Sequence, residues 1–452
     1  MILTDLNSEQ DIGANCLLAE IGPFRFLIDS GVHPKKLGVA SLPRLGRLPE
    51  LDFVVLTHCH LDHLGALPVV LRKQPRVEVL CSPASALVAK RILRNSVTVM
   101  LRQREEAGVR DYPLFSYEEL DAVEKALRPL PLLSRRVLRG VGDAEIAVTL
   151  HPAGHVAGAV GCLLEHKHRR IFFTGDVLFH DQETVSRAEF PSAPVDTLVT
   201  ETTHGAVAPL EGVSRAGETA RLLELVNGVV AHGGSVLIPA FAFGRMHEML
   251  TLLGEARRRG ALAGCPVFCS GLGIDLADYF DLMTRKTGAV RFRRRVLQEL
   301  GVRSLSQRFV PPGRDLPEKG IYLLSSGMLV ENTPAWRVAA NLLDHARNAV
   351  CFVGYCDPDS PGGRLLGCRR GDTFAFPGLD HVAHVRARVE RFYFSGHAGR
   401  DELVAFARRC DPRSIVLTHG DPPARKWFEE ALAEELPGAR VFDPAPGVAV
   451  QV

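Results

Sequence analysis

The feature that most constrains this chain is a repeated pattern in which an apolar run ends in a loop that carries histidine or aspartate. The pattern occurs in LDFVVLTH, IAVTLHPAGH, RRIFFTGDV and VDTLVTETTHG. Apolar runs of this length, bounded by turn residues, indicate buried strands. Because strand ends in an α/β core gather at one edge, the pattern predicts a layered α/β fold with a polar site at that edge.

The densest group of titratable side chains follows the first of these strands, in THCHLDH. A chance H-x-H-x-D-H is rare, roughly one chain in a thousand at 17 histidines in 452 residues. In an extended loop His58 and His60 point the same way and can bind one cation. Asp62 and His63 fall where the chain turns into a helix, so they can face a second cation. Cys59, between the ligands, is expected to point away as a structural thiol.

Two cations need more than four ligands, and later strand ends offer three. His155 and Asp176 follow strands in the first half of the chain, and His419 follows the last strand. The resulting hypothesis is a two-ion site with these ligands: His58, His60 and His155 on one ion, Asp62, His63 and His419 on the other, and Asp176 shared. Imidazole and carboxylate without thiolate suit zinc or a similar divalent ion. An ion pair of this kind can generate a bound hydroxide at neutral pH.

Asp29, in FLIDSGVHP, has two interpretations that the sequence leaves open. One is a carboxylate that orients a ligand histidine through a hydrogen bond. The other is a turn residue before Ser30 and Gly31.

The sequence pattern changes between about residues 207 and 393, where expected strands alternate with expected helices. Alternation of this kind predicts a second parallel sheet. The strand-then-histidine pattern returns at FSGHAGRDEL and SIVLTHGD. We therefore expect a core domain formed by residues 1–206 and 394–452, interrupted by an α/β domain at 207–393.

Composition excludes few classes of function. A formal charge of +2 does not indicate nucleic-acid binding, although it permits a local basic patch. The ten cysteines are scattered without a C-x-x-C pair, which favours buried thiols in a reducing compartment. The first residues carry acids where a signal peptide needs an apolar core, and no apolar run approaches ~18 residues. The expectation is a cytoplasmic protein that does not cross a membrane.

The order of THCHLDH, HPAGHVAGA, FTGDV and a late THGD resembles the metallo-β-lactamase superfamily. VTETTHG, IPAFAFGRMHEML, LLSSGML, FVGYCDPDSPGGRLL and FSGHAGRDEL narrow the resemblance to its β-CASP branch, whose members include the pre-mRNA 3′-end endonuclease subunit, its prokaryotic relatives and ribonuclease J. The resemblance runs from about Ile12 to Pro422. It implies an α/β fold, a metallo-β-lactamase αββα sandwich with an inserted β-CASP domain, with two Zn²⁺ ions and cleavage of nucleic-acid phosphodiesters by a metal-bridging hydroxide.

Carried over by position, the resemblance gives catalytic roles to two residues outside the metal ligands. Glu201 holds His397, and His397 donates a proton to the leaving oxygen, which suits an alkoxide leaving group. Asp62 and Asp176 complete the expected catalytic set. Histidine at position 419 resembles the RNA-processing members more than the DNA-repair members, so RNA is the expected substrate and single-stranded DNA the alternative. Relatives often form dimers, so the resemblance allows a homodimer.

Phosphate contacts are expected from the SSGM turn, where Ser325, Ser326 and Gly327 can form an anion nest after a strand. Two basic runs in the inserted domain, residues 257–259 and 293–295, are candidates for nucleic-acid contact, with a solvated surface as the alternative. The chain departs from its relatives at His204, His247, Gly271 and Gly399. None of these four removes an expected ligand, but they leave the substrate contacts open.

Three other functions fit parts of the sequence. A catalytically silent scaffold subunit of a nuclease complex would show broken ligand motifs, and these are intact. Hydrolysis of a small ester by the core domain alone does not explain the insertion. The same chemistry on single-stranded DNA changes only the substrate. The sequence does not distinguish endonucleolytic from exonucleolytic attack.

Overall fold

The computed structural model describes residues 1–208, 210, 212–305 and 310–452 of the chain. The chain forms two compact units. Unit 1 comprises Met1–Asp181, Val185–Pro209 and His397–Val452, and unit 2 comprises Gln182–Thr184 and Leu210–Gly396. Unit 1 is therefore discontinuous in sequence and is completed by the last segment of the chain.

Unit 1 is built on two seven-stranded sheets. The first has the order β22-β1-β2-β3-β4-β5-β6, with β1 (Ile2–Asp5), β2 (Leu17–Ile21), β3 (Phe24–Ile28), β4 (Phe53–Val55), β5 (Glu78–Cys81), β6 (Leu127–Pro129) and β22 (Ala449–Gln451). The second has the order β21-β20-β11-β10-β9-β8-β7, with β7 (Arg136–Arg139), β8 (Glu145–Pro152), β9 (Val160–His166), β10 (Arg169–Phe173), β11 (Thr197–Glu201), β20 (Ser414–Thr418) and β21 (Arg440–Phe442).

The two sheets face each other across an apolar core. Phe26 and Phe53 of the first sheet stack at 4.7 Å within it, and Phe173 and Val416 of the second sheet belong to the same cluster. Burying each such side chain contributes about 1.5–3 kcal/mol. The outer face of the second sheet packs through Phe172 against α11 and α12. The core explains why the alternating positions of these strands are apolar.

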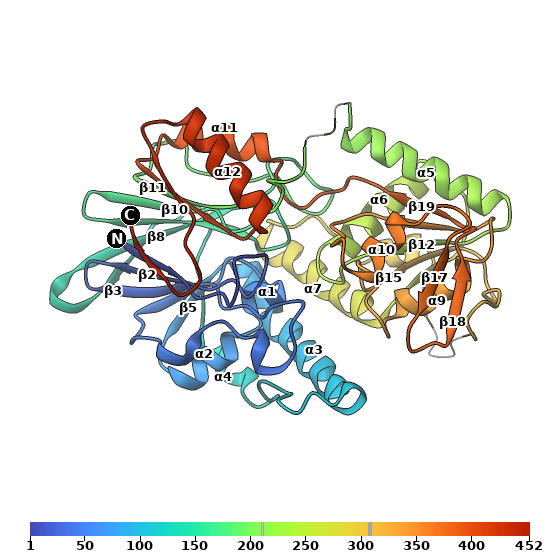
Figure 1. Ribbon diagram of the computed structural model, residues 1–452, viewed down its shortest axis with the longest axis horizontal. Coiled ribbons are helices and arrows are strands. Elements are labelled where there is room, and N and C mark those ends of the chain that lie inside the picture. Colours follow the sequence, from blue (N-terminus) through green and yellow to red (C-terminus); the bar gives the residue numbers. More distant parts are fainter. Residues whose placement is uncertain (209, 211, 306–309) are drawn as a thin grey trace. The chain divides into compact units, whose positions relative to one another are not determined.

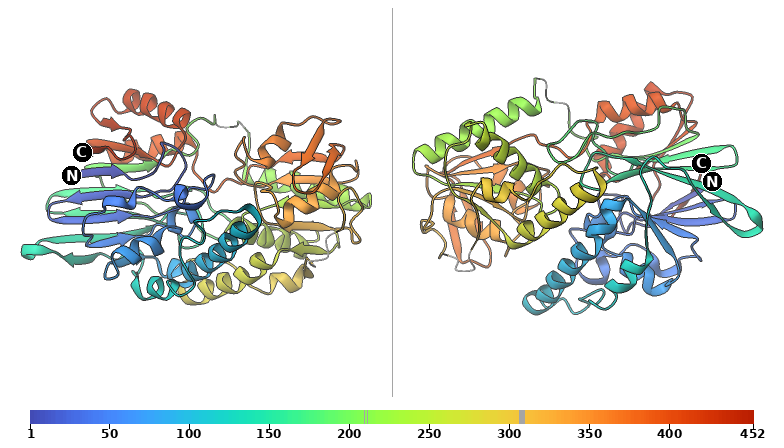
Figure 2. Two further views of the ribbon diagram at one scale, coloured as in Figure 1. Left: turned by 60° about the horizontal axis from the view of Figure 1, so that its bottom comes forward. Right: turned by 180° about the vertical axis from the view of Figure 1, so that it is seen from behind.

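Helices form the two outer layers of unit 1. One layer contains α1 (Leu61–Leu64), α2 (Leu67–Lys73), α3 (Pro83–Ala107) and α4 (Leu120–Ala126), and the other contains α11 (Arg400–Cys410) and α12 (Pro422–Glu435). The helix, sheet, sheet, helix order can be followed in Figure 1 and, from behind, in the right-hand view of Figure 2. Three short 3-10 turns, Gly38–Ser41, Leu45–Arg47 and Val141–Asp143, lie in its loops. The predicted αββα sandwich is confirmed.

Unit 2 has a parallel six-stranded sheet in the order β14-β13-β15-β12-β16-β19. Its strands are β12 (Val236–Pro239), β13 (Val267–Cys269), β14 (Val302–Ser304), β15 (Ile321–Leu324), β16 (Ala349–Phe352) and β19 (Arg388–Arg391). Its helices are α5 (Arg215–Ala231), α6 (Arg245–Arg258), α7 (Gly271–Thr287), α8 (Val296–Glu299), α9 (Pro334–Leu342) and α10 (Pro361–Gly367), and a hairpin adds β17 (Thr373–Phe376) and β18 (His381–His384). This is the inserted α/β domain that the sequence predicts.

The central strands of unit 2 are buried along their whole length, as continuous apolar runs in a parallel sheet should be. On one face they pack with Trp336 of α9 and with Phe374 and Phe376 of the hairpin. Serine hydroxyl groups cap the N-termini of two helices of unit 2. At α5, Ser214 accepts a hydrogen bond from Gly217 N at 3.1 Å, and at α10, Ser360 accepts one from Gly363 N at 3.1 Å. Such caps satisfy amide groups that the first helical turn leaves unpaired.

Two glycines allow the loops of unit 1 to approach one another closely. A Cβ on Gly31 would lie 1.7 Å from the carbonyl oxygen of Asp62, and one on Gly420 would lie 2.1 Å from the hydroxyl of Thr202. Both positions adjoin loops that carry predicted ligands, so the absence of a side chain there lets these loops converge. Among the described residues, none of the helices has the combined length and apolar character that a bilayer span requires.

Candidate metal centre

The loop between β4 and α1 places four predicted ligands at the edge of the first sheet. β4 is fully buried, and the chain leaves it as a loop that ends at His60, whose backbone is extended directly before α1. His58 and His60 therefore precede the helix, while Asp62 and His63 lie within its first turn, as predicted. Strand ends of the second sheet bring His155, Asp176 and His419 to the same edge from loops after β8, β10 and β20.

The first donor cluster consists of His58, His60, His155 and Asp176, whose ligand atoms all lie within 4.8 Å of one another. Nδ1 of His60 lies 3.0 Å from Nε2 of His58 and 3.1 Å from Nε2 of His155. Oδ2 of Asp176 lies 3.6 Å and 3.7 Å from the same two Nε2 atoms. Residues up to 118 positions apart thus present nitrogen and oxygen donors to one small volume.

The second donor cluster consists of Asp62, His63 and His419, again within 4.8 Å. Oδ2 of Asp62 lies 3.8 Å from Nε2 of His63 and 3.5 Å from Nε2 of His419. Asp176 contacts this cluster too, with Oδ2 at 3.4 Å from His63 Nε2 and Oδ1 at 3.5 Å from His419 Nδ1. Asp176 therefore touches both clusters, as expected for a shared ligand.

Hydrogen bonds around the clusters assign the histidine tautomers. Nδ1 of His63 lies 2.7 Å from Oδ2 of Asp29, so it carries a proton, and Nε2 is the atom that faces the cluster. The Thr57 hydroxyl donates to the same oxygen of Asp29 at 2.7 Å and can accept from His58 Nδ1 at 3.2 Å, which leaves a lone pair on Nε2. Asp29 thus takes the orienting position rather than acting only as a turn residue.

The donor set fits a bound cation. Three imidazole nitrogens face one another at about 3 Å in the first cluster, and the proton of one cannot satisfy the lone pairs of the others. Oδ1 of Asp176 is buried and accepts no hydrogen bond from the described residues. Burial, with His63 nearby, holds the pKa of His58 well below its ordinary value. Burial opposes ionisation of Asp176, but His419 and His63 hold its pKa well below its ordinary value. Neutral imidazole and ionised carboxylate are the forms that bind metals.

Glu201 and His397 form an ion pair beside the clusters. Nδ1 of His397 lies 2.9 Å from Oε2 of Glu201, and its ring centroid lies 4.4 Å from that of His155. Glu201 is buried at the end of β11, where its Oε1 accepts a hydrogen bond from Val177 N at 2.6 Å. Burial opposes the charge on His397, but the Glu201 carboxylate raises the pKa of His397 to about 9. His397 therefore holds a proton at neutral pH.

Three further residues support this site, and the sequence analysis did not predict them. The Thr203 hydroxyl donates to Oε2 of Glu201 at 2.5 Å and can accept from Nδ1 of His419 at 2.9 Å. Nδ2 of Asn15 lies 3.3 Å from Nε2 of His63. Arg425, buried in α12, donates to the carbonyls of Leu417 and Gly420 at 3.1 Å and 2.7 Å. These carbonyls flank His419, so Arg425 fixes the loop that carries it.

Cys59 and the four residues that depart from the resemblance lie in different parts of the structure. The thiol of Cys59 is buried, 3.5 Å from the carbonyl of Ser85, and burial raises its pKa. His247 stacks on Phe280 at 3.9 Å inside unit 2. Gly399 precedes α11, where its amide donates to Glu402 at 2.9 Å, and Gly271 is the first residue of α7. The ring of His204 lies 5.8 Å from that of His397, so it lies beside the site.

The expected phosphate contacts lie in unit 2, directly after β15. The hydroxyl groups of Ser325 and Ser270 meet at 3.2 Å at the carboxyl ends of neighbouring parallel strands. Ser326 accepts a hydrogen bond from Val330 N at 2.9 Å. A Cβ on Gly327 would lie 3.0 Å from Phe241. The structure thus places these residues together in one turn, and their role in binding phosphate stays a prediction.

An αββα sandwich with histidine and aspartate donors at its strand ends defines the class of metallo-hydrolases. Comparison with family models agrees: residues 11–205 match the metallo-β-lactamase superfamily, 246–365 the β-CASP domain, and 382–444 the Zn-dependent metallo-hydrolase RNA specificity domain. The chain belongs to the β-CASP branch of the metallo-β-lactamase superfamily. This confirms the family that the sequence motifs indicate.

Individual relatives are distant. The transcription termination factor FttA of Cenarchaeum symbiosum is 28% identical over 95% of this chain and 67% of its own length. The endoribonuclease YSH1 of Candida glabrata is 26% identical over 94% of this chain and 56% of its own length. The chain therefore spans between half and two thirds of these proteins. A crystal structure of a protein of unknown function from Enterococcus faecalis V583 covers 100% of the chain with a TM-score of 0.56 at 12% identity, which supports the fold alone.

Proposed function

We propose that this protein is a two-zinc ribonuclease. The observation that carries the proposal is the ion pair of His397 and Glu201 beside two clusters of metal donors. Bound there, such ions would supply Lewis acidity to water and to the scissile phosphate. We assign one ion to His58, His60 and His155, the other to Asp62, His63 and His419, and Asp176 to both.

His397 is the proposed general acid. Its Nδ1 faces Glu201, so Nε2 is the atom that can deliver a proton to the leaving oxygen as the bond from phosphorus breaks. The carboxylate stabilises the charged imidazole, and the raised pKa keeps it protonated at neutral pH. Since a ribose alkoxide leaves poorly without a proton, a protonated histidine here is suited to the reaction.

RNA is the proposed substrate. The match of residues 382–444 to an RNA specificity domain supports it, and one relative is named an endoribonuclease. Residues 382–444 include both His397 and His419, so the segment that matches the RNA model also carries two side chains of the site.

The test is digestion of one RNA labelled in parallel at its 5′ and its 3′ end, with a single-stranded DNA of the same sequence beside it. Metal content is measured on the same preparations. We expect zinc, cleavage of RNA that a chelator abolishes, and retention of metal by His397→Ala with loss of cleavage. Equal cleavage by His397→Ala would overturn the acid assignment. Protein without bound zinc and without hydrolysis would favour the scaffold alternative, and DNA cut in preference to RNA would change the substrate.

A further inference from the structure

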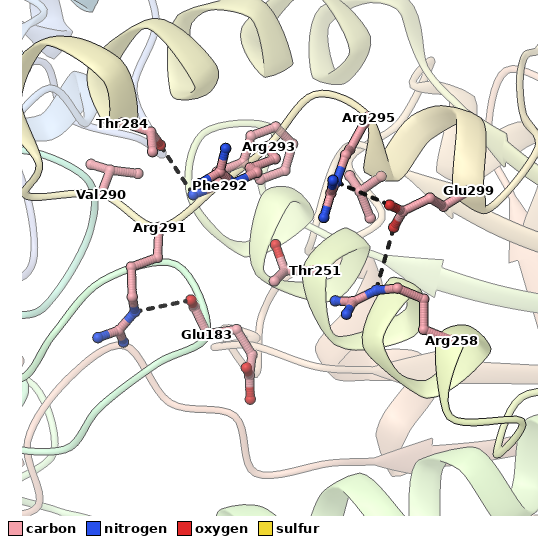
Figure 3. Close-up of a pocket in the computed structure, with 11 residues that line it drawn as sticks. Glu183, Thr251, Arg258, Thr284, Val290, Arg291, Phe292, Arg293, Arg295 and Glu299 are labelled. Atoms are coloured by element: carbon pink, nitrogen blue, oxygen red, sulfur yellow. Dashed lines mark hydrogen bonds and ion pairs between the residues drawn. The ribbon is translucent and has the colours of Figure 1, made fainter.

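The two basic runs noted in the sequence meet around one cavity in unit 2. The cavity has a volume of about 330 Å³ and lies between α6, the C-terminal part of α7, the following loop and α8. Arg258 lines it from α6, and Arg291, Arg293 and Arg295 line it from the loop. Arg258 lies more than thirty residues before Arg291, Arg293 and Arg295 in the sequence, so only folding brings it to them (Figure 3).

The charge around this arginine pocket is predominantly positive. Its lining includes four arginines and two carboxylates, Glu183 and Glu299. Glu299 lies between two of the arginines, 3.1 Å from Arg295 and 3.5 Å from Arg258, as Figure 3 shows. Arg291 donates to the backbone carbonyls of residues 182 and 183 at 2.5 Å and 3.4 Å. These contacts hold three guanidinium groups in place.

Arg293 differs from its neighbours. Within the part of the chain that the structure describes, its exposed guanidinium makes no hydrogen bond or ion pair, whereas adjacent Arg294 turns to Asp278 in an ion pair and does not line the pocket. A guanidinium at the mouth of a cavity, with its donors unused, can bind a phosphate through two parallel hydrogen bonds.

The interior wall of the pocket is apolar. Val290, Phe292 and Val296 are buried side chains that line it, and Thr251 and Thr284 add hydroxyl groups. Cavities that bind small organic ligands measure ~300–1,000 Å³ and combine apolar walls with a few polar groups. This volume exceeds the need of a bare phosphate ion. It suits a ligand with an anionic end and an uncharged ring.

We propose that the arginine pocket binds a nucleotide through its phosphate, in a site separate from the metal centre. The nucleotide can be a free mononucleotide or one unit of an RNA strand, since both present the same phosphate and ring. The inference uses residues of unit 2 only, so it stands or falls independently of the proposed ribonuclease activity.

The test compares neighbouring arginines that do and do not line the pocket. Binding of adenosine 5′-monophosphate is measured by calorimetry on the whole 452-residue chain, with adenosine as the uncharged control. A short fluorescein-labelled RNA is titrated in an Asp176→Ala background so that the strand stays intact. We expect Arg293→Ala and Arg258→Ala each to weaken binding about tenfold or more, the effect of losing a hydrogen bond to a charged group.

The matched controls are Arg294→Ala and Arg259→Ala, which we expect to stay within about twofold because their side chains lie outside the pocket. Arg293→Lys should recover part of the affinity, because it keeps the charge and loses the planar fork. Affinity for RNA should fall steeply with rising salt. If the arginine variants lose affinity for adenosine 5′-monophosphate, the pocket binds a free nucleotide. If they lose affinity for the RNA alone, the pocket binds one unit of an RNA strand. The proposal is overturned if Arg293→Ala and Arg258→Ala leave the affinity for both ligands unchanged. It is also overturned if neither ligand binds.

Discussion

The strand ends of the two units differ in chemistry although both units contain parallel strands that open into loops. In unit 1 the loops after β4, β10 and β20 carry His58, Asp176 and His419. In unit 2 the loops after β13 and β15 begin with Ser270 and Ser325, whose hydroxyl groups bond to each other. A sheet edge therefore provides a place for a site, but the first residues after each strand decide what the site can do.

The units also differ in how their buried charges are satisfied. Unit 1 buries ionisable groups at its strand ends, where they face one another across the donor clusters. Unit 2 buries the carboxylate of Glu248 in the first turn of α6 and satisfies it with hydrogen bonds from its own residues. Glu248 accepts hydrogen bonds from Glu183 N at 2.7 Å and from Thr184 N and Oγ1 at 2.9 Å and 2.8 Å, and it pairs with Arg215. The first arrangement is open to a ligand, and the second is structural.

The largest effect is expected from Asp176→Ala, which removes the group that touches both donor clusters. Metal content should fall, and cleavage of RNA should drop by at least about 10³-fold, because Asp176 is the carboxylate that contacts histidines of both clusters. The measurements are metal analysis and end-labelled RNA digestion. If Asp176→Ala kept its full metal content and cleaved RNA at the wild-type rate, the contrast between the units would be wrong. The strand ends of unit 1 would then be no more reactive than those of unit 2.

His397→Ala should reduce cleavage by about 10²–10⁴-fold without loss of metal, the usual range for a removed general acid. His204→Ala is the control, since its ring lies 5.8 Å from that of His397 and it is neither a proposed ligand nor the proposed acid. A loss of metal equal to the loss of activity would make His397 a ligand rather than the proton donor.

The pH dependence of cleavage should report the same histidine. Its pKa is raised to about 9, so the acid is protonated in the neutral range and is lost as pH rises through that pKa. Bound cations nearby lower the pKa, so the alkaline limb of the kcat/KM profile should fall at or below about pH 9. The measurement is single-turnover cleavage across pH. An identical limb in the residual activity of His397→Ala would assign the titration to another group.

Glu248→Ala should destabilise unit 2 by about 3–5 kcal/mol, because it leaves Arg215 and two backbone amides without their buried acceptor. Glu255→Ala, on the same helix but with exposed arginine partners, should change stability by less than about 1 kcal/mol. Chemical denaturation followed by a probe in unit 2 measures both. Similar losses for the two variants would show that burial does not distinguish these carboxylates.

The smallest effect is expected from Ser325→Ala, at a strand end of unit 2. Loss of one neutral hydroxyl contact to a phosphate should raise KM about twofold to tenfold and leave kcat and metal content unchanged. Steady-state cleavage at several RNA concentrations separates the two parameters. A large fall in kcat would show that a strand end of unit 2 takes part directly in the reaction. The contrast with unit 1 would then be wrong.

Local spacing was sufficient to predict the core of the candidate site. Extended backbone at His60 and a helical turn at Asp62 follow from six consecutive residues, and the structure has both. His155, Asp176 and His419 were predicted because each follows an apolar strand, and strand ends meet at one edge. Thr203, Asn15 and Arg425 escaped prediction because their residue types are common in loops and helices, and nothing local marks their distant partners.

The sequence by itself determined the fold, the family and the residue types at each strand end, because burial periodicity and turn chemistry are local properties that a chain carries with it. Only the tertiary structure decided which nitrogen of each histidine faces its neighbours, that Thr203 lies between Glu201 and His419, and that two separate arginine runs line one cavity. Those features depend on hydrogen bonds and packing between residues far apart in sequence. They exist only once the intervening chain has closed its loops and buried its strands.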